Sequence, residues 1–252
     1  MAYEMNPSAT HIHQALETVA LLRQQRAAFP ALVAANAAIK RFQAKRFEAT
    51  YPDLLQSPRY QAAARFFLYE LYSAKDYGER DQQFARIVST IATLFPQSVV
   101  KTAAALAQVH TLTEQLDDAM ARVYVALQAS EPDQSEAARY IGCWRQVANL
   151  AARRQQLEMV VALGKSLDSL THKLGLRTLL KVMRGPAAAA GLGSLQLFLE
   201  AGFDAFQTMH GADEFLTRIS MRETDWMVWL FEEDAALCES RLTGLLAEKI
   251  IV

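Results

Sequence analysis

Cysteine is scarce in this sequence of 252 residues, which contains only Cys143 and Cys238. The two cysteines lie far apart and match no spacing of a metal-binding or redox motif. A disulfide scaffold is therefore excluded, and we expect reduced thiols packed inside a cytoplasmic protein.

An excess of charge of either sign is also lacking. Lysine and arginine together number 26, aspartate and glutamate number 27, and the formal net charge is −1 with neutral histidines. No global charge therefore draws the chain to nucleic acid or to an anionic membrane.

Long apolar segments are missing too. The longest stretches without Asp, Glu, Lys or Arg are residues 185–199 and 87–100, whereas a membrane span requires roughly 20 apolar residues. Residues 1–14 carry Glu4, where a secretory signal would have a basic start followed by an apolar stretch. We therefore expect a soluble protein with no membrane span.

Recognisable catalytic and metal motifs are absent. Residues 185–191 have the wrong glycine spacing for a phosphate loop, and neither a nucleophile elbow nor a dinucleotide-binding pattern occurs. No histidine follows a glutamate by three residues, and four pairs spaced by four residues are typical of ordinary helix surfaces. These pairs are His13 with Glu17, His110 with Glu114, Asp168 with His172, and His210 with Glu214. We predict neither a metal nor a cofactor.

Apolar residues spaced three and four apart run through almost the entire chain, and no segment alternates cleanly over six or more residues. This spacing predicts an all-α protein, a multi-helix bundle of about eight to ten helices in two bundle-like layers. No Ser- or Pro-rich linker and no repeat of fixed period divides the chain, so residues 1–252 are predicted to form a single domain. A split near residue 130 is the alternative.

Three helices can be assigned from this spacing. Residues 97–129 and 140–163 are predicted to be long antiparallel helices joined by a short turn at 131–133. Residues 186–206 are predicted to form a helix that begins at Pro186. Small side chains cover much of this last helix, which permits close packing of helices or leaves room for a ligand.

The densest segment of the chain begins at Phe66 and reads FFLYELYSAKDYGERD. Arg80 and Asp81, at its end, fall on the apolar stripe of the following helix, where charged side chains need partners. We expect Arg65 or Glu70 to complete a partly buried ion-pair network with them. An anion-binding or catalytic site is the alternative.

A second charged pair interrupts an apolar stripe nearer the C-terminus, where Arg222 and Glu223 lie between Phe215 and Leu230. Two charged pairs that touch two core stripes can face each other across the fold and form a polar centre in an apolar bundle. The sequence therefore predicts one binding site with these residues: Arg80, Asp81, Arg222, Glu223 and Tyr72.

The segment that begins at Phe66 resembles a family of uncharacterised bacterial proteins, which share an FFL-x-x-LY turn followed by an Asp and an Arg-Asp pair. The resemblance continues through residues 184–206 and 219–223 and spans much of residues 58–223. It implies an all-helical bacterial protein. Because no activity is established for such proteins, it carries over no catalytic residue.

Charge is unevenly distributed along the chain. Residues 1–50 hold six Lys or Arg against three Glu, and residues 213–241 hold three Arg against eight acidic residues. The two ends can attract each other within a chain or between subunits, although solvated charges are the commoner outcome. Together with the many apolar helix faces, this asymmetry predicts a homodimer.

Two classes of function fit this sequence. The first is a helical binding or interaction protein that holds an apolar ligand or a partner helix. The second is a helical-bundle enzyme that acts on an apolar or acyl-like substrate around the predicted charges. A cavity of roughly 300–1,000 Å³ at those charges would favour a ligand carrier or an enzyme, and a fully packed core would favour a scaffold.

Overall fold

Helices are the only regular elements in the described part of the chain, which comprises residues 7–71, 75 and 77–247 of a computed structural model. The predicted all-α class is confirmed. The predicted eight to ten helices are too few, because these residues form thirteen α-helices and one π-helical turn, η1. The elements are α1 Pro7–Ala27, α2 Pro30–Thr50, α3 Pro52–Gln56, α4 Gln61–Phe66, η1 Phe67–Leu71, α5 Gly78–Leu94, α6 Gln97–Ser130, α7 Glu136–Val147, α8 Leu150–Thr171, α9 Leu176–Val182, α10 Arg184–Ala189, α11 Gly193–Met209, α12 Asp213–Glu232 and α13 Ala235–Ala247.

Prolines mark several helix ends. Pro30 and Pro52 begin α2 and α3, at a position where the missing N–H removes no helical hydrogen bond. Pro96 is the N-cap of α6, and Pro132 follows shortly after its last residue. A proline disfavours the helical conformation in the residue before it. Pro96 therefore keeps Phe95 extended and separates α5 from α6, and Pro132 ends α6 at its C-cap, Glu131. The helix predicted over residues 97–129 is confirmed.

The single helix predicted over residues 140–163 is wrong, because the chain breaks there between α7 and α8. Ala148 has a left-handed φ of 49°. The Oδ1 of Asn149 accepts a hydrogen bond from the backbone N–H of Ala152 at 3.1 Å and caps α8. An asparagine that caps a new helix competes with continuation of the old one, and apolar spacing does not reveal this competition.

The helix predicted over residues 186–206 also divides in two. Pro186 lies in α10, and α11 begins only after Gly191, whose φ of 66° favours glycine. The carbonyl of Gly191 accepts a hydrogen bond from Arg86 of α5 at 2.9 Å, so the turn is attached to a neighbouring helix.

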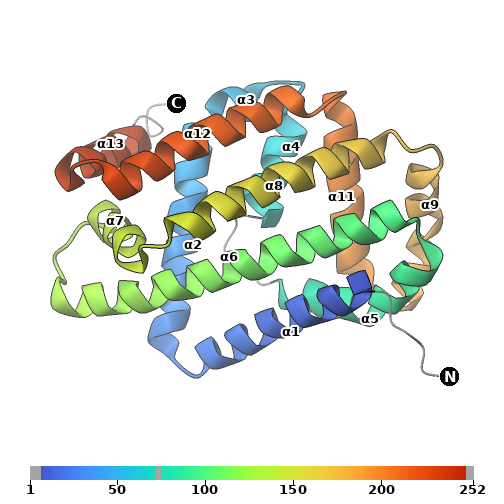
Figure 1. Cartoon of the computed structure of the whole chain (residues 1–252), viewed down its shortest axis with the longest axis horizontal. Helices are drawn as coiled ribbons and strands as arrows, with labels where there is room; N and C mark the ends of the chain where they lie inside the picture. The colour runs from blue at the N-terminus through green and yellow to red at the C-terminus, as the bar shows by residue number, and fades with distance from the viewer. Residues whose placement is uncertain (1–6, 72–74, 76, 248–252) are drawn as a thin grey trace.

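Figure 1 shows α1, α6, α8 and α12 running alongside one another across the molecule. Contacts join them in that order, α1 to α6, α6 to α8 and α8 to α12. Helices α2 and α11 cross this row steeply, with α2 packed on α6 and α11 packed on α8. Helix α5 packs on α1 and α11, which places its first turn between two helices that are distant in sequence.

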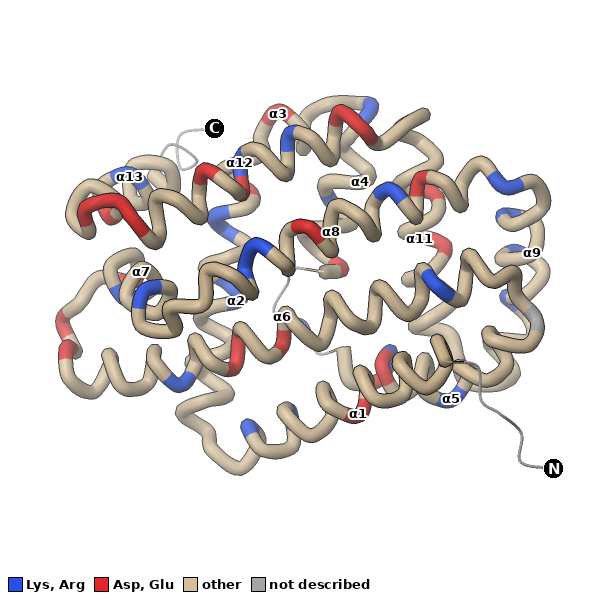
Figure 2. Tube along the Cα trace, in the orientation of Figure 1, with Lys and Arg blue, Asp and Glu red and all other residues tan. Residues whose placement is uncertain are grey.

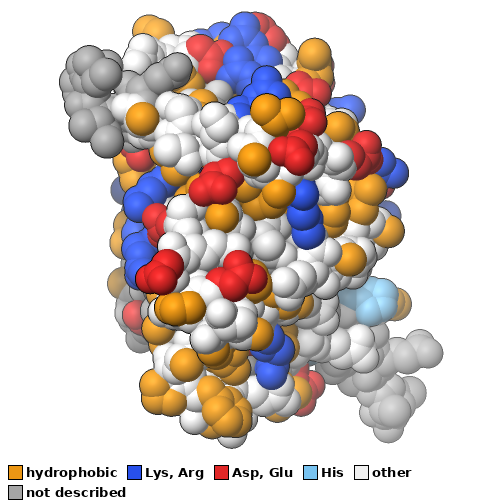
Figure 3. Space-filling view, turned by 90° about the vertical axis from the view of Figure 1, so that its left-hand side faces the viewer, with side chains coloured by type: hydrophobic (Ala, Val, Ile, Leu, Met, Phe, Trp, Pro, Cys, Tyr) orange, Lys and Arg blue, Asp and Glu red, His pale blue; other side chains and the backbone are white. Residues whose placement is uncertain are grey.

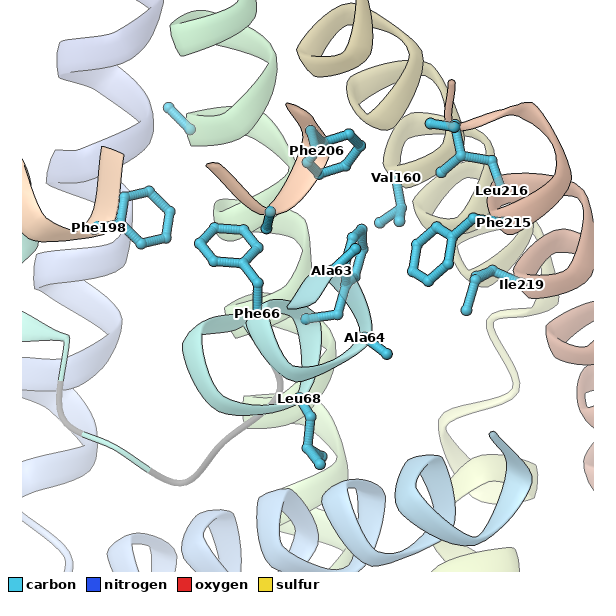
Figure 4. Close-up of a cluster of buried hydrophobic side chains, with 14 of the residues drawn as sticks. Ala63, Ala64, Phe66, Leu68, Val160, Phe198, Phe206, Phe215, Leu216 and Ile219 are labelled. Carbon is cyan, nitrogen blue, oxygen red and sulfur yellow. The ribbon is translucent and has the colours of Figure 1, made fainter. Parts of the chain in front are cut away.

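Buried apolar side chains form two clusters. The first contains aromatic residues of α4, η1 and α11, and Figure 4 shows Phe66 and Phe198 within it, with ring centroids 5.4 Å apart. The second lies where α2, α6, α7, α12 and α13 meet, and its rings include Phe42 and Tyr140, 4.4 Å apart. Helix α6 contributes side chains to both clusters.

Three acidic residues of α6 are buried between the two clusters. Glu114, Asp117 and Asp118 lie after Ala107, which belongs to the first cluster, and before Met120, which belongs to the second. Figure 2 shows acidic residues as red segments in the middle of α6. Buried carboxylates require hydrogen-bonding or cationic partners. Arg26 of α1 and Lys40 of α2 supply them to Glu114.

Gly164 permits the close approach of α8 and α12. A Cβ at this position would lie 2.5 Å from Cδ2 of Leu216, a side chain that is 1% exposed, so one of the two helices or side chains must shift. We expect Gly164→Ala to lower the free energy of unfolding by about 1–3 kcal/mol, as overpacking does. The control is Gly244→Ala in α13, where nothing lies within 4 Å and alanine should stabilise by about 0.5–1 kcal/mol. Urea denaturation measures both, and an equal effect at the two sites would contradict this packing.

Candidate functional site

Asp81 lies in the first turn of α5, and its carboxylate is bound by residues of two other helices. Nη1 of Arg23 in α1 and Nε2 of His110 in α6 each lie 2.8 Å from its Oδ2. Nε of Arg80 lies 3.7 Å from its Oδ1. Burial by itself would raise the pKa of Asp81, but the hydrogen bond from His110 and the charges of Arg23 and Arg80 outweigh it and lower that pKa.

The predicted ion-pair network therefore forms, but with different partners. Arg65 is exposed. Glu70 contributes its backbone carbonyl, which accepts a hydrogen bond from Nη1 of Arg80 at 3.2 Å, while its carboxylate pairs with Lys75. The helix that carries Glu70 is adjacent in sequence, whereas the residues that bind Asp81 come from helices brought together only by folding.

Arg80 is a nearly buried cation held against aromatic rings. Its side chain is 13% exposed, and its Cζ lies 4.2 Å from the ring centroid of Tyr77 and 4.3 Å from that of Phe198. Burial lowers the pKa of Arg80, and the nearby Asp81 offsets only part of this effect. The guanidinium is thus poorly hydrated, which strengthens its interaction with any anion that reaches it.

The second predicted pair lies in another part of the molecule. Glu223 accepts hydrogen bonds from Nη1 and Nη2 of Arg46 in α2, at 3.1 and 2.7 Å, and one from Tyr51 at 2.8 Å. Arg222 binds Asp53 at the surface, and this hydrogen bond raises the pKa of Arg222.

The single polar centre predicted from both pairs is not formed. Within the described residues, no hydrogen bond or ion pair joins Arg80 or Asp81 to Arg222 or Glu223. Helix α5 packs on α1, α6 and α11, whereas α12 packs on α7 and α8. Tyr72, the fifth predicted site residue, lies outside the described residues.

Further buried charges extend from Asp81 along α6. Nη2 of Arg23 lies 4.0 Å from Glu114, which also binds Arg26 at 2.9 Å and Lys40 at 2.5 Å. Burial alone would raise the pKa of Glu114, but Lys40 and Arg26 lower it to about 2. Apart from Arg122, an exposed residue that pairs with Asp118, we call the connected residues the charge network: Arg23, Arg26, Lys40, Arg80, Asp81, His110, Glu114 and Asp118.

A cavity of about 270 Å³ lies beside one end of the charge network. Its wall is mostly apolar and comes from η1 and from helices that include α5, α6, α8, α9 and α11. In the described part of the chain, the charged or imidazole side chains in this wall are Arg80, Asp81 and His110. Two predicted site residues therefore line a cavity, which the sequence did not reveal.

His110 is the site residue that sequence reasoning missed. The sequence pairs it with Glu114, but its Nε2 points to Asp81 instead. It follows Ala103 and Leu106 at helical spacing, and all three line the cavity. Their position on one face of the helix was the sequence signal that could have identified His110 as a site residue.

No three or more His, Cys, Asp or Glu side chains in residues 7–71, 75 and 77–247 are grouped so that they could hold a metal ion. Over the same residues, no helix combines the length and apolar character needed to cross a membrane.

The fold and the site define an all-α protein with a mostly apolar cavity and a buried charge network at its edge. Residues 22–237 match the family described as Domain of unknown function (DUF8198), and the chain belongs to this family. The predicted membership of an uncharacterised family is confirmed, while its bacterial origin stays a prediction. No curated protein and no solved structure matches the chain.

Proposed function

We propose that this protein binds an apolar small molecule in the cavity beside Arg80 and Asp81. The cavity itself carries the proposal, because its volume of about 270 Å³ is close to the lower end of ligand pockets, roughly 300 Å³. Natural cores rarely leave such a space unfilled. A mostly apolar wall with a few convergent polar groups is typical of a ligand pocket.

The size of the cavity favours a small molecule over a partner helix. One turn of an α-helix with its side chains occupies roughly 400–600 Å³, given a diameter of 10–12 Å and a pitch of 5.4 Å. Six carbon atoms of benzene fit an apolar cavity of about 150 Å³, so this cavity suits a ligand of roughly ten to twelve non-hydrogen atoms.

An enzyme acting on an apolar or acyl-like substrate is the second candidate. The contact of 2.8 Å between His110 and Asp81 on the cavity wall favours it, because a carboxylate that orients an imidazole is the arrangement of a general base. Arg222 and Glu223 do not line this cavity, so neither the ligand-binding proposal nor the enzyme proposal gives them a role. A carrier releases its ligand unchanged, whereas an enzyme releases a chemically altered product.

A cytoplasmic homodimer is proposed as the state of the protein. Charge supports it less than the sequence suggests, because Arg46 of the basic end already binds Glu223 of the acidic end within one chain. Exposed apolar side chains on α12 and α13 support it more, namely Met221, Val228 and Leu237. On the face seen in Figure 3, apolar side chains are interspersed with charged ones, so that face offers no continuous apolar patch.

Binding of decanol tests the proposed function. Native mass spectrometry of the purified protein first reveals any bound ligand and the number of subunits, and calorimetry then measures decanol affinity. We expect Ala103→Phe, which fills much of the cavity from α6, to weaken decanol binding at least tenfold. Ala126→Phe is the control, since Ala126 lies on an exposed part of the same helix. Equal decanol affinity in the two variants would refute the proposal.

A further inference from the structure

We propose that the ligand carries a carboxylate and that Arg80 binds this group where the cavity meets the charge network. The inference rests on the proposed function, because it assigns one end of a ligand that must first occupy the cavity. It defines the ligand class as a medium-chain amphiphilic acid.

Within the described part of the chain, one edge of the Arg80 guanidinium makes no hydrogen bond. Its Nη1 donates to the carbonyl of Glu70, and its Nε lies 3.7 Å from Asp81, beyond hydrogen-bond distance. Across residues 7–71, 75 and 77–247, Nη2 donates to no protein acceptor. The guanidinium lines the cavity while two rings cover part of its surface. A planar guanidinium with free N–H groups is suited to a carboxylate.

The sign of the charge at this end of the cavity also favours an anion. Among the wall residues that the structure describes, Asp81 is the single acid, and Arg23, Arg80 and His110 surround it. Two arginines against one carboxylate leave one positive charge in excess when the imidazole is neutral. Glu114 does not cancel this excess, because Arg26 and Lys40 bind it. The charge of Glu70 also reaches Arg80, but the carboxylate of Glu70 is paired with Lys75.

The excess of one positive charge at this end of the cavity also distinguishes a carboxylate from other head groups. A phosphate monoester brings a charge of roughly −1.5 to −2 at neutral pH, which exceeds the single positive charge available here. An amine would add a cation beside Asp81, where Arg23 and Arg80 already place two positive charges against one carboxylate. An alcohol would leave the desolvated charge of Arg80 uncompensated.

Three ligands with the same ten-carbon chain test the inference: decanoate, decanol and decylamine. Titration calorimetry at pH 7.5, with protein stripped of any bound ligand, should give an affinity for decanoate about tenfold or more above that for decanol, the factor expected of one charge-assisted hydrogen bond. Decylamine should bind most weakly. This comparison uses the unaltered protein, so it does not depend on the folding of any variant.

Arg80→Gln should abolish the preference for decanoate over decanol, because it removes the cation that the carboxylate binds. Arg86→Gln is the matched control, because Arg86 is exposed on the same helix and outside the cavity wall, and it should keep the preference. Equal affinity for decanoate and decanol, or tightest binding of decylamine, would overturn the inference while the proposed function stands. Binding of none of the three would overturn both.

Discussion

Asp81→Ala is expected to lower the free energy of unfolding by about 3–5 kcal/mol, the range for removing one partner from a buried ion pair. The substitution leaves Arg23 and Arg80 facing each other across the vacated position, with His110 beside them. The largest part of the loss is expected at Arg80. Its side chain is only 13% exposed, so water cannot replace the interaction with the carboxylate. Urea denaturation followed by circular dichroism measures the loss.

Asp53→Ala is the matched control for this experiment. Asp53 is also an aspartate bound by two arginines, Arg218 and Arg222, but its side chain is 38% exposed. Exposed ion pairs contribute about 0–1 kcal/mol, so the control should change stability little. A fully stable Asp81→Ala protein would contradict the structural role of Asp81, because it would show that Arg23 and Arg80 do not need this carboxylate in the folded state.

The second large effect is expected at Glu114, which is 2% exposed and bound by Arg26 and Lys40. Glu114→Gln keeps the size of the side chain and removes its charge. The folded-state pKa is lowered from 4.5 to about 2, which corresponds to on the order of 3 kcal/mol of stability at neutral pH. We expect the variant to lose about that much at pH 7.

The pH dependence separates this charge effect from a packing effect. Because the pKa of Glu114 is lower in the folded state, its stabilisation is fully present above pH 4.5 and is lost as the pH falls from 4.5 toward 2. The difference between the unaltered protein and Glu114→Gln should therefore shrink between pH 5 and pH 3. Glu17→Gln, at an exposed position of α1, should show no difference at either pH. A constant difference at Glu114 would contradict the electrostatic origin.

Helical class and the limits of the longest helix could be predicted because the responsible signals are local. Apolar side chains at helical spacing define a buried stripe wherever the neighbours lie, and Pro96 and Pro132 restrict the backbone beside them. The break at Ala148 escaped this reasoning, since the apolar stripe continues through it and only the capping bond of Asn149 ends the pattern.

The need for partners at Arg80 and Asp81 could also be predicted, because a charge on an apolar stripe must be compensated wherever the stripe is buried. The identity of the partners could not. Arg23 and His110 reach Asp81 only because α1 and α6 pack beside α5. The sequence offered nearer candidates in Arg65 and Glu70, and separation along the chain is a poor guide to distance in a folded bundle.

What the sequence by itself determined is the all-α class, a chain without an evident catalytic motif, and two charged pairs that require compensation. Tertiary structure alone decided that one pair borders a cavity while Glu223, of the other pair, binds Arg46 and Tyr51. The physical reason is that a cavity forms where neighbouring helices do not completely fill the space between them. Side-chain spacing within each helix specifies which face is buried, but it does not specify the distances between the helices that enclose that space.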